Sequence, residues 1–181
     1  GNLYVADTRY SHVRRVDKFG VITAYVGNGF PGDQGDGGPS ISACITSPFS
    51  VAVGPDGDLY LGDSVGRIRK VEHSTGIIRT VVGTGVPGYA GDGGFADQAS
   101  ISGPFDMDFD GDGNLYFADT GNHCVRKVMP SGKIQTVIGT GNPGRAEEGS
   151  RPRKFRLDSP RGVALKSDGT LFVSDTGNDR V

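Results

Sequence analysis

Short apolar runs separated by turn residues dominate the chain, and none has the spacing of an amphipathic helix. In one stretch the runs lie at 49–53, 58–62, 67–71 and 77–82, and each is rich in β-branched and aromatic residues. Gly, Pro, Asp and Ser bound every run, as in the "GPDG" and "HSTG" segments. The pattern therefore predicts four short strands joined by tight connections, which favours an antiparallel meander.

This four-strand pattern recurs with a period of 56 residues. The segments "GNLYVADT", "GDLYLGDS", "GNLYFADT" and "GTLFVSDT" begin at Gly1, Gly57, Gly113 and Gly169. A second marker, "VGNG", "VGTG" or "IGTG", and a proline at 48, 104 and 160 keep the same period. Self-similarity at this length indicates a repeat architecture. Four up-and-down strands per repeat make one blade of an all-β propeller, so we predict a β-propeller of four-stranded antiparallel blades.

The repeat units resemble a known family. The string "SPFSVAVGPDGDLYLGDSVGRIRKV" and its copy "GNLYFADTGNHCVRKV" are similar to NHL repeats, and the loop "GTGVPGYAGDGG" is typical of secreted or multidomain NHL proteins. The resemblance covers nearly all of the chain and implies a six-bladed ring. It favours an extracellular or secreted location and leaves open a place in a larger signalling or thioredoxin-fused protein.

The period divides the chain into parts of four blades. We expect strands b to d of the first at 1–27, full blades at 48–83 and 104–139, and strands a and b of the fourth at 160–181. This is a partial propeller of residues 1–181, an open arc of about three blades. Remaining blades of the same full-length chain, or a second copy, would complete the ring. Because 170–181 would duplicate a strand of a second copy, we favour an arbitrary cut.

Composition narrows the partner classes. The net charge is −2, and no apolar run approaches the ~20 residues of a membrane helix. Paired basic residues recur on strand c in every blade, and we expect them to snorkel over apolar strand edges. We expect no nucleic-acid partner because the aromatic residues occupy strand positions. The cysteines, Cys44 and Cys124, fall at different repeat positions and predict two unpaired thiols.

Other recurring features have structural interpretations. An Asp followed by Thr or Ser ends strand b in each blade, and such a pair can hydrogen-bond turn backbone: Asp7, Asp63, Asp119 and Asp175. The connections 27–47, 83–103 and 139–159 are long enough to be functional, and we expect all three on one face. The first two carry "GDGG", which we interpret as a turn. The third carries "RPRKFR" at 151–156 instead, either a solvated loop or a contact for an acidic partner.

Four carboxylates around one strand are the candidate metal ligands. Asp106 and Asp108 occupy the innermost strand of the third blade, where the other blades have small residues. Asp108, Asp110 and Asp112 also match the opening of a calcium loop, although strands rather than helices flank it. Two interpretations stay open: a cation or ligand site at the channel, or carboxylates that face water or accept backbone N–H groups of the neighbouring blade. Calcium is the one cofactor that the motif admits.

No catalytic residue or cofactor site follows from the sequence. The histidines, His12, His73 and His123, lie in turns or at strand c starts, so they form no zinc set. We therefore expect a non-catalytic binding or scaffold module that recognises a protein, peptide or glycan through its loop face. The alternative is a hydrolase or lyase of the six-bladed type with a metal-assisted site at the central channel. An enzyme predicts a cation near Asp106 and Asp108, and a scaffold predicts none.

Overall fold

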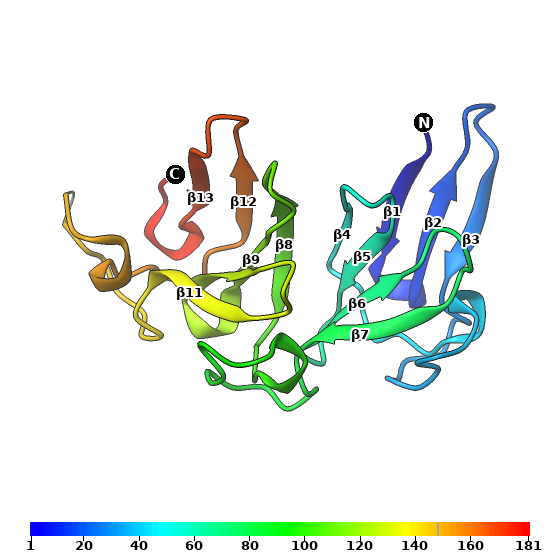
Figure 1. The fold of residues 1–181 in the computed structure, drawn as a ribbon, viewed down its shortest axis with the longest axis horizontal. Helices are drawn as coiled ribbons and strands as arrows, with labels where there is room; N and C mark the ends of the chain where they lie inside the picture. Colours follow the sequence, from blue (N-terminus) through cyan, green and yellow to red (C-terminus); the bar gives the residue numbers. More distant parts are fainter. Residues whose placement is uncertain (148) are drawn as a thin grey trace.

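The computed structural model describes residues 1–147 and 149–181, and it consists of four antiparallel sheets arranged side by side (Figure 1). The sheets are β1-β2-β3, β4-β5-β6-β7, β8-β9-β10-β11 and β12-β13. They are open-arc blades of a β-propeller, which confirms the predicted fold class. Their strands are β1 (Leu3–Asp7), β2 (His12–Val16), β3 (Ile22–Val26), β4 (Ser50–Val53), β5 (Leu59–Gly62), β6 (Ile68–Val71), β7 (Ile78–Val82), β8 (Pro104–Phe109), β9 (Leu115–Asp119), β10 (Cys124–Val128), β11 (Ile134–Gly139), β12 (Gly162–Leu165) and β13 (Leu171–Ser174).

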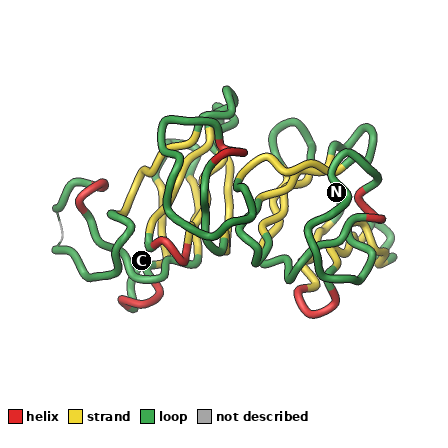
Figure 2. Tube along the Cα trace, turned by 90° about the horizontal axis from the view of Figure 1, so that it is seen from below, coloured by secondary structure: helices red, strands yellow, loops and turns green. Residues whose placement is uncertain are grey.

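The helical segments are single 3-10 turns within the connections (Figure 2). The strands predicted for the second period begin one residue later in the structure and end at the predicted residues. The local pattern of apolar runs and turns therefore determined the strands closely. The turns are η1 (Thr8–Tyr10), η2 (Ser40–Ser42), η3 (Ala96–Gln98), η4 (Thr120–Asn122), η5 (Pro152–Lys154) and η6 (Thr176–Asn178).

The hydrophobic core lies between successive sheets. One cluster joins Val13 of the first sheet to Leu61 of the second, and the next joins Ile68 of the second to Phe117 of the third. The long connections contribute fully buried side chains to both clusters, among them Ile45 and others from the same loops: Ala43, Ala96, Ala99 and Ile101. Because burying an aliphatic side chain such as Ile45 is favourable by about 1.5–3 kcal/mol, the core itself holds the loops in place.

The innermost strands and the long connections form two separate regions of the arc. Strands β4, β8 and β12 are each innermost in their sheets and pack next to one another, with the rings of Phe49 and Phe105 stacked at 4.6 Å. The 27–47 and 83–103 connections run along the bottom of Figure 1, whereas the β2–β3 turn lies at the top. We call the surface formed by the 27–47, 83–103 and 139–159 connections the loop face.

Candidate functional site

The first two long connections each form backbone hydrogen bonds with the outermost strand of the next blade. In the first, Gly37 N donates to Ile78 O at 2.8 Å, and Ile78 N donates to Gly38 O at 3.0 Å. The second repeats this with Gly93 N to Ile134 O at 2.7 Å. Gly37 and Gly93 both have φ near +80°, a conformation that disfavours other residues. The "GDGG" segments are therefore turns, as predicted, and they extend the edge of the following sheet.

A buried arginine, Arg69, holds the first connection against the second blade. The Arg69 side chain on β6 is fully buried, and its Nη2 and Nε donate to Asp36 Oδ1 at 2.6 and 3.0 Å. Thr80 N donates to the other oxygen of Asp36 at 2.8 Å. Burial opposes ionisation of Asp36, yet the hydrogen bonds from Thr80 and Arg69 hold its pKa below the ordinary value. The aspartate of "GDGG" thus links the loop to two strands of the next blade.

We call this group of a buried strand c arginine, a loop aspartate and a strand d threonine the latch. The third blade repeats the latch, and the two latches contradict part of our prediction for the strand c basic residues. Arg126 on β10 is also fully buried, and its Nη2 donates to Asp92 Oδ1 at 2.9 Å. Thr136 donates to Asp92 through both its backbone N and its hydroxyl. The prediction that these arginines snorkel over strand edges is wrong for Arg69 and Arg126, because each lies directly after a register shift in its strand pair and beneath the loop. No feature of one blade alone signals a partner 33 residues away.

Two of the aspartates that end strand b accept backbone hydrogen bonds, Asp63 from its own turn and Asp119 from the long connection. Asp63 Oδ1 accepts Val65 N and Arg67 N at 3.1 and 3.0 Å. Asp119 Oδ1 accepts Ser102 N at 2.7 Å, which joins the strand to the long connection. Burial raises the pKa of both Asp63 and Asp119 to about 6, against the hydrogen bonds that favour the charged forms. Their recurrence and their backbone contacts fit a structural role.

The two channel carboxylates bond to the neighbouring blade. Asp106 Oδ2 accepts Val163 N at 3.0 Å, and Asp108 Oδ2 accepts Leu165 N at 2.7 Å. These N–H groups belong to β12 and point away from its partner β13. Burial raises the pKa of Asp106, and the nearby Asp108 charge adds to that rise. Of the two interpretations left open, the geometry supports acceptance of backbone donors across the blade interface.

The structure separates the four candidate metal ligands into two groups. Asp110 lies in the turn after β8, where its Oδ1 accepts Asp112 N at 3.1 Å and Asn114 N at 2.8 Å. Asp106 and Asp108 face β12 instead. Among the residues that the structure describes, no three His, Cys, Asp or Glu side chains are grouped as metal ligands. Calcium binding by these residues stays a prediction.

The structure assembles one His–Asp–Ser group that sequence spacing did not indicate. His123 Nδ1 lies 3.4 Å from Asp158 Oδ1 and accepts Ser159 N at 3.0 Å. The Ser159 hydroxyl donates to Asp158 rather than to the imidazole, at 3.0 Å. A serine nucleophile needs its hydroxyl against the base, so this trio is not arranged for nucleophilic catalysis. It joins the third blade to the fourth.

The loop face exposes apolar side chains on this fastened framework. Phe30 is 70% exposed and Val86 is 65% exposed, and they occupy equivalent positions of the first two connections. Tyr89 and Phe95 on the second connection are also exposed. Exposed aromatic and apolar groups on a rigid support are typical of binding surfaces.

Comparison with known proteins places the chain among NHL-repeat sequences. No family model matches it. It is 29% identical over 203 residues to human NHL repeat-containing protein 2, covering 99% of this chain and 27% of that protein. It is 28% identical to the Arabidopsis thaliana protein SUPPRESSOR OF QUENCHING 1, covering 90% of this chain and 16% of that protein. The chain thus spans about a quarter or less of the length of these relatives.

Solved structures share the fold at lower identity. An auxiliary nutrient binding protein from Bacteroides ovatus superposes with a TM-score of 0.75 and 21% identity, over 99% of this chain and 44% of that one. Virginiamycin B lyase from Staphylococcus aureus gives a TM-score of 0.58 and 16% identity, over 97% and 45% of the two chains. Within residues 1–147 and 149–181, no helix has the length and apolar character to cross a membrane. Its 56-residue repeat, its four-stranded sheets and its relatives together support an NHL-repeat β-propeller family for this chain.

Proposed function

We propose that the chain is a non-catalytic binding or scaffold module that recognises a protein, peptide or glycan through its loop face. The observation that carries this proposal is the fastening of exposed loops by buried side chains. Arg69 and Arg126 hold the first two connections in place, while Phe30 and Val86 on those connections stay exposed. A loop fixed before binding loses less conformational entropy when a ligand arrives, which favours affinity.

The relatives are compatible with a binding role and also with others. The structural neighbours include proteins named as a nutrient binding protein, a lyase and a putative gluconolactonase. A shared fold does not determine function, so the proposal rests on the loop face of this chain rather than on those names.

A selection experiment tests the proposal. Random phage-displayed peptides and an arrayed glycan panel are presented to the chain, and the affinity of each recovered ligand is measured by calorimetry. Combined Phe30→Ser and Val86→Ser substitutions should weaken binding by about tenfold or more, because they remove the exposed apolar contacts. Phe19→Ser is the matched control, since Phe19 is 79% exposed on the β2–β3 turn of the opposite face. Recovery of no ligand, or equal affinity for the double variant, contradicts the proposal.

The second candidate is a hydrolase or lyase with a metal-assisted site at the channel. One observation favours it: Asp106 is half-buried beside Asp108 and its pKa is raised. Its support is smaller, because both carboxylates already accept backbone N–H groups of β12. A calcium titration followed by thermal melting separates the candidates. A calcium-dependent rise in Tm that Asp106→Asn abolishes supports the enzyme, and an unchanged Tm supports the binding module.

A further inference from the structure

A polar hollow of about 310 Å³ opens where the second connection meets the outermost strand of the third blade. The hollow is lined by Tyr89 and Asp92 from that connection and by Thr136 and Gly139 from β11. Thr140, at the start of the third connection, and Arg153, from η5, complete the lining. The side chain of Arg153 is 62% exposed. A concave site with a few convergent polar groups and one aromatic ring is a common form of ligand site.

The repeat provides an internal control for this hollow. At 56 residues earlier, Asp36, Thr80 and Thr84 occupy the places of Asp92, Thr136 and Thr140, so these residue types belong to the shared latch. Asp33 stands in the place of Tyr89 and Asp97 in the place of Arg153. The blade architecture therefore does not require the tyrosine or the arginine. Tyr89 and Arg153 distinguish the hollow at the third blade from the equivalent region at the second blade.

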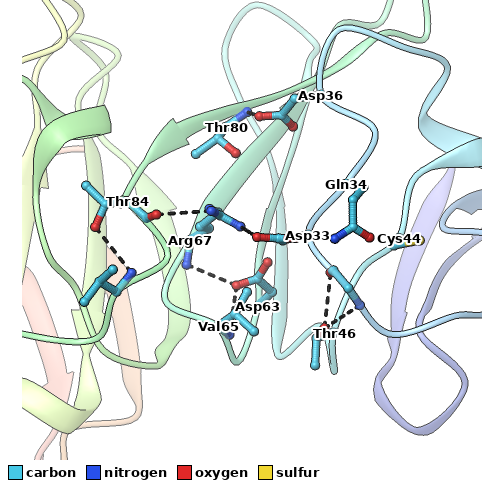
Figure 3. A network of polar contacts seen from close by, with 12 residues as sticks. Asp33, Gln34, Asp36, Cys44, Thr46, Asp63, Val65, Arg67, Thr80 and Thr84 are labelled. Atoms are coloured by element: carbon cyan, nitrogen blue, oxygen red, sulfur yellow. Dashed lines mark hydrogen bonds and ion pairs between the residues drawn. The ribbon is translucent and has the colours of Figure 1, made fainter.

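The first copy also fills the corresponding region with its own side chains. There Arg67 Nη1 donates to Asp33 at 2.6 Å, and Nη2 donates to Thr84 O at 3.1 Å (Figure 3). In the third blade the residue aligned with Arg67 is Cys124, which is buried and too short to bridge the same groups. The hollow is left open in the copy that carries the aromatic ring and the cation.

Within the hollow, Asp92 positions the cation. Arg153 Nη2 donates to Asp92 Oδ2 at 3.3 Å, and Arg153 Nε donates to Thr136 O at 2.9 Å. The remaining guanidinium N–H groups are available to a ligand. The ring of Tyr89 is held by its hydroxyl, which lies 3.0 Å from Thr136 Oγ1, and the residue is 43% exposed. A fixed guanidinium beside a fixed aromatic ring suits a ligand that has both an anionic group and a flat, weakly polar face.

A second hollow of about 550 Å³ continues the positive charge. It shares Thr136 and Arg153 with the first and adds Gln135, Val137, Arg151, Pro152 and Lys154. Arg151 and Lys154 are both exposed. An elongated ligand with an anionic group on successive units would therefore meet successive cations across the two hollows.

The outer edge of β11 is not free for an extended peptide. Thr136 N donates to Asp92 and Thr136 O accepts from Arg153. Ile134 exchanges backbone hydrogen bonds with the second connection, at Gly93 and Gly94. A peptide that binds by adding a strand needs those backbone groups. The geometry favours compact rings with hydroxyl groups over an acidic peptide strand.

We propose that the two hollows bind an acidic oligosaccharide, with a sugar ring against Tyr89 and its carboxylate or sulfate on Arg153. The following sugar units then lie along Arg151 and Lys154. This inference deepens the proposed binding role and rests on it, but it uses residues other than Phe30 and Val86. If acidic saccharides fail to bind while peptides still bind at Phe30 and Val86, this inference is wrong and the proposed binding role stands.

The probes are an oligogalacturonate hexamer, a heparin hexasaccharide, neutral maltohexaose and polyglutamate, each titrated calorimetrically into the full chain. At least one acidic saccharide should bind, and the two acidic probes distinguish carboxylate from sulfate as the anionic group. Arg153→Gln and Tyr89→Ser should each weaken that binding by about tenfold, and added salt should weaken it further. Arg79→Gln removes an equally exposed arginine from β7 and should leave the affinity unchanged.

Three outcomes would overturn the inference. They are failure of both acidic saccharides to bind, binding of maltohexaose as tight as that of the acidic probes, and polyglutamate binding that Arg153→Gln weakens equally. Lys154→Gln, at an exposed residue, keeps the test independent of the contacts that Arg153 makes with Thr136 and Asp92. It should weaken oligosaccharide binding while leaving the Tm unchanged.

Discussion

The buried latch between Arg69 and Asp36 leads to a stability prediction. Arg69→Met keeps an unbranched apolar stem of similar length and removes the guanidinium. The loss comprises two hydrogen bonds to Asp36, one to Cys44 O at 2.8 Å and one to Gln34 O at 3.3 Å. Asp36 keeps the hydrogen bond from Thr80 and is partly open to water, which limits the penalty.

The expected loss of unfolding free energy follows from the burial of Arg69 in this ion pair. Removing one member of a buried ion pair typically costs about 3–5 kcal/mol, and the 43% exposure of the Asp36 side chain places this case near the lower value. We therefore expect Arg69→Met to lower the free energy of unfolding by about 3 kcal/mol. Arg79→Met on the next strand is the control, because Arg79 is 61% exposed and lies 3.7 Å from Glu72. That change should cost no more than about 0.5 kcal/mol.

The assay is urea denaturation of the parent and both variants, followed by tyrosine fluorescence and circular dichroism. An Asp36→Asn variant and the double variant complete a cycle that isolates the interaction of the two side chains. The reasoning is refuted if Arg69→Met costs less than about 1 kcal/mol, or if the two arginine variants lose equal stability.

Three further predictions concern stability. Asp63→Asn should stabilise the chain relative to the parent, by an amount that grows to about 3 kcal/mol as pH rises from 4 to 6. The folded pKa of about 6 exceeds the unfolded value, so ionisation of Asp63 in the unfolded state destabilises the parent over this range; chemical denaturation across pH checks this. Gly91→Ala should destabilise by at least about 1 kcal/mol, since φ is +96° and the new Cβ would lie 2.7 Å from Ala99 Cα; an unchanged Tm contradicts it. Asp108→Ala should cost about 1–3 kcal/mol by leaving Leu165 N unpaired, as measured by urea titration.

Local patterns determined the blade, its strands and its period. Alternating β-branched residues and Gly- or Asp-containing turns act over a few residues, so 77–82 was predicted as a strand and β7 lies at Ile78–Val82. The structural role of Asp63 could also be predicted, because this aspartate recurs in every blade and every blade needs a turn after strand b. For the channel, the sequence indicated unusual carboxylates and left two interpretations open.

Tertiary structure decided which side chains meet across blades. Asp106 and the N–H of Val163 lie 57 residues apart, and the contact exists because β8 and β12 pack side by side. Arg69 lies beneath a loop that begins in the preceding blade, so a basic residue that resembled a surface group is fully buried. Tyr89 and Arg153 likewise line one hollow only because two connections converge on β11. Strand formation depends on neighbouring residues, whereas burial and ligand geometry depend on how the sheets pack.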